Sequence, residues 1–132
     1  MSLTAARVMA TIPAQNLDRA RQYYANTLGL TPAVEQSSAG VLFVCGEDSW
    51  FLLYETQFAG TAGHTLATFV VDDIEAHVAD LRGRGVIFEE YDFPGLKTEN
   101  GIATMDNGRS AWFHDSENNI LAVTQLNPEV SL

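Results

Sequence analysis

The order of predicted secondary structure repeats once along the chain. A strand near residues 7–13, a helix beginning at Leu17 and a set of strands ending at 56 are followed, from residue 64 onward, by the same order. A shift of 57 residues brings Leu17 onto Ile74, and these residues begin the apolar stripes of the two predicted helices. Sequence identity between the halves is negligible, so the repeat is one of pattern. Such a duplication predicts an α+β fold with two pseudo-symmetric sheets.

The repeat also sets the expected boundaries. A chain of 132 residues forms one compact unit, or two very small modules that share a core. We therefore expect a single domain over 1–132. Within it we place module 1 at about 5–56, a small and polar linker at 57–63, module 2 at about 64–126 and a tail at 127–132.

Capping residues and glycines mark the ends of both predicted helices. Asn16 suits the N-cap of the first helix, and Gly29 suits the left-handed position after it. Asp72 followed by Glu75 is typical of a capping box, and Gly85 ends the second helix. Further strands are expected at 30–36, 41–46, 49–56, 65–71, 86–90, 101–105, 109–114 and 119–126, with turns at 37–40, 46–48 and 106–108.

The stretch 91–100 is expected to be a loop, because it contains Phe93, Pro94 and Gly95 in succession. Two interpretations stay open. The loop is either a lid over a pocket or part of a dimer contact. Tyr91 and Phe93 would then contact a ligand or a partner chain.

Charge and cysteine content narrow the classes of partner. The chain carries 17 acidic and 7 basic residues, a formal net charge of −10. This disfavours nucleic acid and anionic membranes as partners, since binding to either requires a basic patch.

The single cysteine, Cys45, cannot form an internal disulfide, which fits a reducing compartment. No apolar run has the length of a signal peptide or a membrane span, so we expect a cytoplasmic protein.

Three local motifs resemble those of the vicinal oxygen chelate superfamily (glyoxalase/bleomycin resistance protein/dioxygenase). Residues 16–24 with 28–30 are similar to its D-L-x-R-S/A-x-x-F-Y…L-G-L signature, and 71–74 to V-D-D-I in its second module. Residues 112–119 are similar to F-F-x-D-P-D-G-N, with Ser116 and Asn118 in place of Pro and Gly. The resemblance covers about residues 6–126. It implies two βαβββ modules whose curved mixed sheets enclose a pocket, in a chain that is often a homodimer.

The resemblance also implies where a divalent metal would be held, by one ligand from the first and one from the last strand of each module. Those positions fall on Met9, Leu53, Leu66 and Ala122. None offers a useful donor to Mg, Mn, Fe or Zn, so we expect no metal cofactor. The alternative is one divalent metal ion at a displaced site made by Glu55, His64 and His114.

The pocket side chains are predicted by strand alternation, since residues two apart share a face. The candidates for ligand binding combine an apolar and aromatic floor with hydroxyl groups and one histidine, as is usual for a small-molecule site. They are Met9, Thr11, Phe51, Leu53, Leu66, Thr68, Ser110, Trp112, His114 and Ala122. His114 is also the one candidate for acid–base catalysis, although the sequence shows no partner for it.

These observations favour metal-independent binding of a small aromatic or cationic molecule, as in family members that sequester drugs such as bleomycin or mitomycin. Trp112 would stack on the molecule. The alternative is a metal-dependent lyase or ring-cleaving dioxygenase that uses the displaced site. A third hypothesis is a partner that uses the fold for protein contacts.

Overall fold

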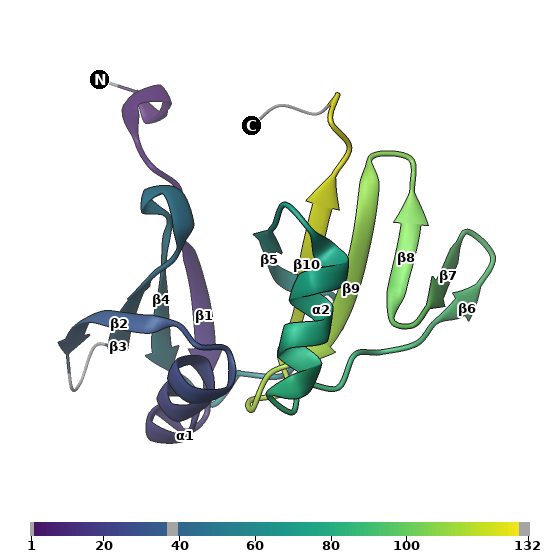
Figure 1. The fold of residues 1–132 in the computed structure, drawn as a ribbon. Coiled ribbons are helices and arrows are strands. Elements are labelled where there is room, and N and C mark those ends of the chain that lie inside the picture. The colour runs from purple at the N-terminus through teal and green to yellow at the C-terminus, as the bar shows by residue number, and fades with distance from the viewer. Residues whose placement is uncertain (1, 37–39, 130–132) are drawn as a thin grey trace.

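The computed structural model describes residues 2–36 and 40–129. Its elements follow the duplicated order, and the described strands form two sheets (Figure 1). Module 1 contains β1 (Ala10–Ala14), α1 (Leu17–Gln22), β2 (Thr31–Gln36), β3 (Gly40–Val44) and β4 (Trp50–Glu55), with strand order β1-β4-β3-β2. β1 runs parallel to β4, and the remaining neighbours are antiparallel. Of the turn expected at 37–40, residues 37–39 lie outside the described residues.

Module 2 has the same plan with an extended sheet. It contains β5 (Thr65–Val70), α2 (Ile74–Gly83), β6 (Asp92–Phe93), β7 (Leu96–Glu99), β8 (Ile102–Met105), β9 (Gly108–His114) and β10 (Ile120–Leu126), with strand order β5-β10-β9-β8-β7-β6. β5 runs parallel to β10, as β1 does to β4. The predicted α+β fold of two βαβββ modules is confirmed.

Two segments of module 2 differ from the sequence prediction. The strand expected at 86–90 forms only an isolated bridge, between Phe88 and Phe113. The loop expected at 91–100 is instead the hairpin β6–β7, whose turn holds Gly95 at φ +84°. Thr98 stabilises this hairpin, because its hydroxyl oxygen accepts from the Tyr91 backbone N–H while the hydroxyl donates to Glu90. Side-chain hydrogen bonds of this kind leave no periodic signal in a sequence.

The helix ends follow the sequence signals, except that the capping box predicted for Asp72 and Glu75 is wrong by one residue, because Asp73 is the N-cap of α2. The Asn16 side chain accepts from the Arg19 N–H, and the Asp73 side chain accepts from the Ala76 N–H, so both act as N-caps. Gly29 and Gly85 have φ values of +74° and +97° after the helices, as expected. No helix within residues 2–36 and 40–129 is long and apolar enough to span a membrane.

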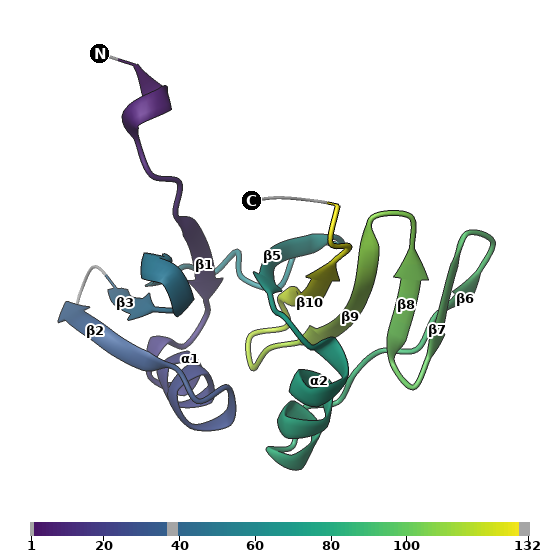
Figure 2. The same ribbon diagram turned by 45° about the horizontal axis from the view of Figure 1, so that its top comes forward.

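The two modules share one hydrophobic core beneath α1 and α2, which lie on one side of the sheets (Figures 1 and 2). Tyr24 lies at its centre, with its ring 5.9 Å from Phe43 and 5.4 Å from Phe51. Phe51 reaches across to Phe69 of module 2 at 6.3 Å. The edge strands β1 and β5 of the two sheets are also close to each other, although they are not hydrogen-bonded as neighbours.

The loop 115–119 fastens module 2 to the start of α1. Asp115 is buried and accepts from the Tyr24 hydroxyl, from the backbone N–H groups of Glu117 and Asn119, and from the Asn119 side chain. Glu117 accepts from the N–H groups of Gln15 and Asn16 and is paired with Arg19. One of the three motifs that carried the family resemblance, residues 112–119, therefore contains a connection between the modules. We call residues 115–119 the staple loop.

Candidate functional site

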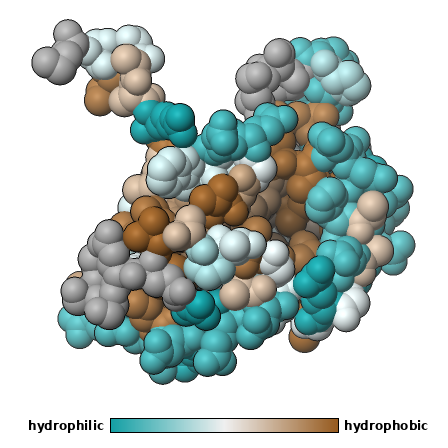
Figure 3. All heavy atoms as spheres, turned by 60° about the vertical axis from the view of Figure 1, so that its left-hand side comes forward, coloured by the Kyte–Doolittle hydropathy of each residue, from teal (hydrophilic) through white to brown (hydrophobic). Residues whose placement is uncertain are grey.

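The side of the sheets away from α1 and α2 has no helix of the described chain over it. We call it the open face and define it by the residues that alternate with core residues along the strands. They are Thr11, Leu52, Tyr54, Thr68, Ser110, Trp112, His114, Ala122 and Thr124. Figure 3 shows hydrophobic residues gathered around a hollow on one side of the molecule. The open face thus combines aliphatic and aromatic side chains with hydroxyl groups and one histidine, the kinds of side chain from which small-molecule sites are built.

Trp112 is the largest side chain that β9 places on the open face. Its neighbours Ala111 and Phe113 are fully or almost fully buried in the core, so alternation directs Trp112 to the other side. The indole N–H donates to the Thr65 hydroxyl at 3.1 Å. Because this hydrogen bond fixes the ring, its face is held ready for contact with another flat group.

Tyr91, the residue directly before the hairpin β6–β7, supplies a second aromatic ring beside Trp112. The Tyr91 ring meets Trp112 edge to face at 5.7 Å and stacks on Phe93 at 5.8 Å. Burial raises the pKa of Tyr91, and the negative charge of Glu89 adds to this effect, so the hydroxyl stays neutral. Tyr91 thus forms part of the wall beside Trp112. Whether the hairpin also acts as a lid or a dimer contact stays a prediction.

His114 has a partner that the sequence interpretation missed. Its Nδ1 lies 2.7 Å from the Glu89 carboxylate, and both side chains are about one third exposed (36% and 37%). The Glu89 N–H donates to the Trp112 carbonyl, which brings residue 89 beside β9. The bridge between Phe88 and Phe113 sets this alignment. Glu89 directly follows Phe88, and His114 directly follows Phe113. Once the bridge between the two phenylalanines is known, the sequence therefore shows that Glu89 and His114 are neighbours.

Hydroxyl groups complete the polar part of the open face. Ser110 and Thr124 lie opposite each other on β9 and β10, and their hydroxyls are 2.8 Å apart. Ala122 is buried on β10 directly opposite Trp112, two residues before Thr124. Thr11 and Thr68 are exposed on the first strand of each module. The structure therefore brings Thr68, Ser110, Trp112, His114 and Ala122 together on neighbouring strands of module 2.

The prediction that Phe51 and Leu53 line the pocket is wrong. Both are buried in the hydrophobic core, Phe51 stacked on Phe43 with ring centroids 5.2 Å apart. The residues of β4 on the open face are instead Leu52 and Tyr54. The sequence Trp-Phe-Leu-Leu-Tyr contains only hydrophobic residues, so alternation gave the strand no phase and the assignment slipped by one position.

Leu66 also differs from its expected place, while the role of Met9 in the pocket stays a prediction. Met9 precedes β1 and is 42% exposed. The register between β5 and β10 shifts between Ile120 and Leu121, which leaves Leu66 as an extra residue that packs against the core. Thr65, as its hydrogen bond with Trp112 shows, presents its side chain to the open face instead of Leu66.

The donor set does not fit a divalent metal at the family position. Met9, Leu53, Leu66 and Ala122 provide no oxygen or nitrogen ligand. The residues of the displaced site have other partners. Glu55 accepts from the Leu17 N–H, His64 Nδ1 lies 3.0 Å from the Thr65 carbonyl, and His114 pairs with Glu89. Among residues 2–36 and 40–129, no three His, Cys, Asp or Glu side chains are arranged to hold a metal ion.

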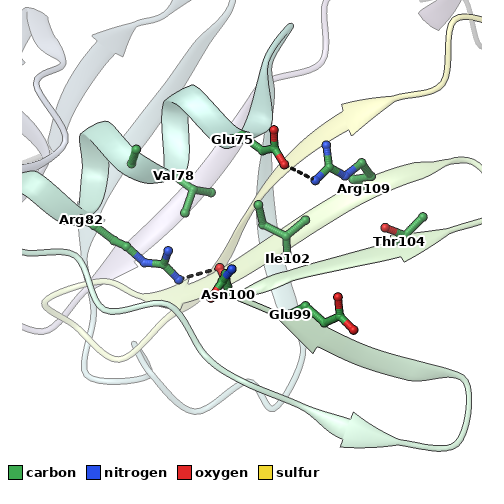
Figure 4. Close-up of a pocket in the computed structure, with 9 residues that line it drawn as sticks. Glu75, Val78, Arg82, Glu99, Asn100, Ile102, Thr104 and Arg109 are labelled. Carbon is green, nitrogen blue, oxygen red and sulfur yellow. Dashed lines mark hydrogen bonds and ion pairs between the residues drawn. The ribbon is translucent and has the colours of Figure 1, made fainter.

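A second hollow of about 390 Å³ lies between α2 and the strands β7–β9 (Figure 4). Its lining carries both signs of charge, but both of its arginines are engaged by other lining residues. Arg109 binds Glu75 at 3.0 Å, and Arg82 donates to the Asn100 carbonyl at 2.6 Å. Since this hollow lies on the helix side and its arginines are engaged, we take the open face as the candidate binding site.

Comparison with known proteins places this geometry in context. Residues 6–123 match the model of the glyoxalase/bleomycin resistance protein/dioxygenase superfamily. No curated protein matches the sequence.

Solved structures with this fold have low sequence identity to the chain. UcmS2 has a TM-score of 0.72 at 16% identity, over 90% of this chain and 97% of that one. TnmS3, an antibiotic binding protein from Streptomyces sp. CB03234, has a TM-score of 0.70 at 21% identity, over 93% and 98%. Lactoylglutathione lyase from Agrobacterium tumefaciens has a TM-score of 0.62 at 21% identity, over 91% and 93%. At these identities the likeness shows a shared fold.

Proposed function

Since this chain belongs to the glyoxalase/bleomycin resistance protein/dioxygenase superfamily, we propose that it uses the superfamily's sheet architecture to bind a small planar molecule without a metal ion. The observation that carries the proposal is the kind of side chain on the open face. None of the side chains that the first and last strands of each module present to the open face is a His, Asp, Glu or Cys, while an oriented Trp112 lies nearby. These side chains are Thr11, Leu52, Tyr54, Thr68, Ala122 and Thr124. Such a surface holds a molecule by contact area and hydrogen bonds.

The composition of the open face favours a flat, aromatic or cationic ligand. The Trp112 ring offers a stacking surface, and its negative face attracts a cation. A net charge of −10 adds a long-range attraction for cationic molecules. Similarity to an antibiotic binding protein supports a drug-like ligand, such as bleomycin or mitomycin C. A cytoplasmic location stays a prediction from the single cysteine.

The proposal predicts that Trp112→Ala weakens binding. Calorimetric titration of protein treated with EDTA against bleomycin and mitomycin C should show binding of at least one drug. Loss of the stacking surface should cost about 2 kcal/mol, or roughly 30-fold in Kd. Phe58→Ala is the matched control, because Phe58 is an exposed aromatic on the connection between the modules.

Absence of binding by both drugs, or an unchanged Kd in Trp112→Ala, would contradict the proposal. Binding that appears only after a divalent metal is restored, and is lost in His64→Ala or Glu55→Ala, would favour the metal enzyme instead.

We further propose that the protein is a homodimer. The segment before β1 exposes large apolar side chains, with Val8 98% and Leu3 87% exposed. Apolar side chains that protrude together from a small domain are stabilised when a partner covers them. Light scattering should give the mass of two chains, and Val8→Asp should shift it toward one chain. A wild-type protein with the mass of one chain at micromolar concentration contradicts this expectation.

A further inference from the structure

Stacking on Trp112 leaves the pair of His114 and Glu89 without a role. A carboxylate only accepts hydrogen bonds, so the hydrogen shared with Glu89 belongs to His114 Nδ1. The other ring nitrogen of neutral His114, Nε2, is then an acceptor. Within the described residues, no hydrogen bond to Nε2 is formed. The Tyr23 hydroxyl donates to the His114 carbonyl at 3.4 Å, which ties down the end of β9.

The position of this acceptor relates it to the aromatic corner. His114 follows Trp112 by two residues on the same face of β9, so their Cα atoms are roughly 7 Å apart. The Trp112 N–H is already engaged by Thr65. A flat molecule that lies against the Trp112 ring therefore has His114 Nε2 near its own edge, as an acceptor for a hydrogen bond.

We propose that His114 recognises an acidic hydroxyl group, a phenol, on the edge of a planar aromatic ligand. The inference rests on the proposed function, since stacking on Trp112 brings the hydroxyl into reach. In the complex the phenol O–H bond breaks and an N–H bond forms at Nε2, while the electron pair stays on the phenolate oxygen. Glu89 is a positioning residue that orients the ring and stabilises the imidazolium with its negative charge.

A matched pair of probes tests this assignment, namely 7-hydroxycoumarin and 7-methoxycoumarin. They share one planar ring system, but only the first has an acidic proton. Wild-type protein should bind the hydroxy compound about tenfold more tightly, the worth of one well-placed hydrogen bond. At a fixed pH, the excitation spectrum of bound 7-hydroxycoumarin should show a larger phenolate fraction than that of the free compound.

His114→Gln should reduce the affinity ratio to about one and abolish the extra phenolate, while 7-methoxycoumarin binding stays unchanged. Glu89→Gln should keep some preference but lower the phenolate fraction, a spectroscopic change that a purely structural role would not produce. His77→Gln is the control, because His77 lies exposed on α2 and bonds the Asp73 carbonyl.

The outcomes separate the two proposals. Equal binding of both coumarins to the wild type, or a preference that survives in His114→Gln, overturns the role of His114 and leaves the binding face intact. Failure of both coumarins to bind overturns the stacking site, and the assignment of His114 falls with it.

Discussion

Asp115→Ala should cost about 4 kcal/mol of unfolding free energy, the largest single-residue effect expected in this chain. The Asp115 carboxylate accepts from Tyr24, which is fully buried, and from the two Asn119 nitrogens. Without the carboxylate, these buried donors have neither a protein acceptor nor water, and each unpaired buried group costs on the order of 1–3 kcal/mol. Urea denaturation should show a lower midpoint with an unchanged slope.

Asp92→Ala is the matched control for this change, because Asp92 is an exposed carboxylate on β6. It should shift the urea midpoint very little. If Asp115→Ala does not accumulate as folded protein, Asp115→Asn keeps the shape and should still be less stable than the wild type. A loss below about 1 kcal/mol in both Asp115 variants would show that the staple loop does not hold the modules together.

Glu117 should make the protein sensitive to acid. Burial by itself raises the pKa of Glu117, but hydrogen bonds from Arg19, from the Asn16 N–H and from Ser116 together lower it to about 2. The ordinary value is 4.5, so the folded state favours the ionised form. The stabilisation is present in full above about pH 4.5 and is lost as the pH falls toward 2. Its size is about 3 kcal/mol.

The comparison of wild type with Glu117→Gln isolates this contribution. The difference in unfolding free energy should be largest near pH 7 and should shrink as the pH falls from 4.5 to 2, since both side chains are then neutral. Glu99→Gln is the control, because Glu99 is exposed on β7, and its curve should follow the wild type at every pH. A difference that does not change with pH would assign the effect of Glu117 to packing.

The fold could be predicted because its signals are local and lie in a fixed order. Asn16 and Gly29 bound the first helical segment through hydrogen bonds and backbone angles that involve near neighbours. Asn118 adopts a φ of +68° in the staple loop, as its replacement of a family glycine suggested. The same loop contacts α1 across about a hundred residues, and no local pattern reveals such a contact.

The candidate site was harder to predict, for two physical reasons. The first five residues of β4 are all hydrophobic and show no alternation, so Phe51 and Leu53 were assigned to the wrong face. The pairing of His114 with Glu89 depends on the bridge at Phe88, which joins segments far apart in the chain. Glu55 likewise accepts from the Leu17 N–H, and these residues are 38 positions apart in the chain.

The location of a bound molecule tests the central claim most directly. A crystal structure of EDTA-treated protein with bleomycin or 7-hydroxycoumarin should show the ligand against the Trp112 ring, close to Thr65 and His114, with no ion between ligand and protein. A ligand seated instead between α2 and β8, or a metal ion held by protein side chains on the open face, would contradict metal-free binding by contact.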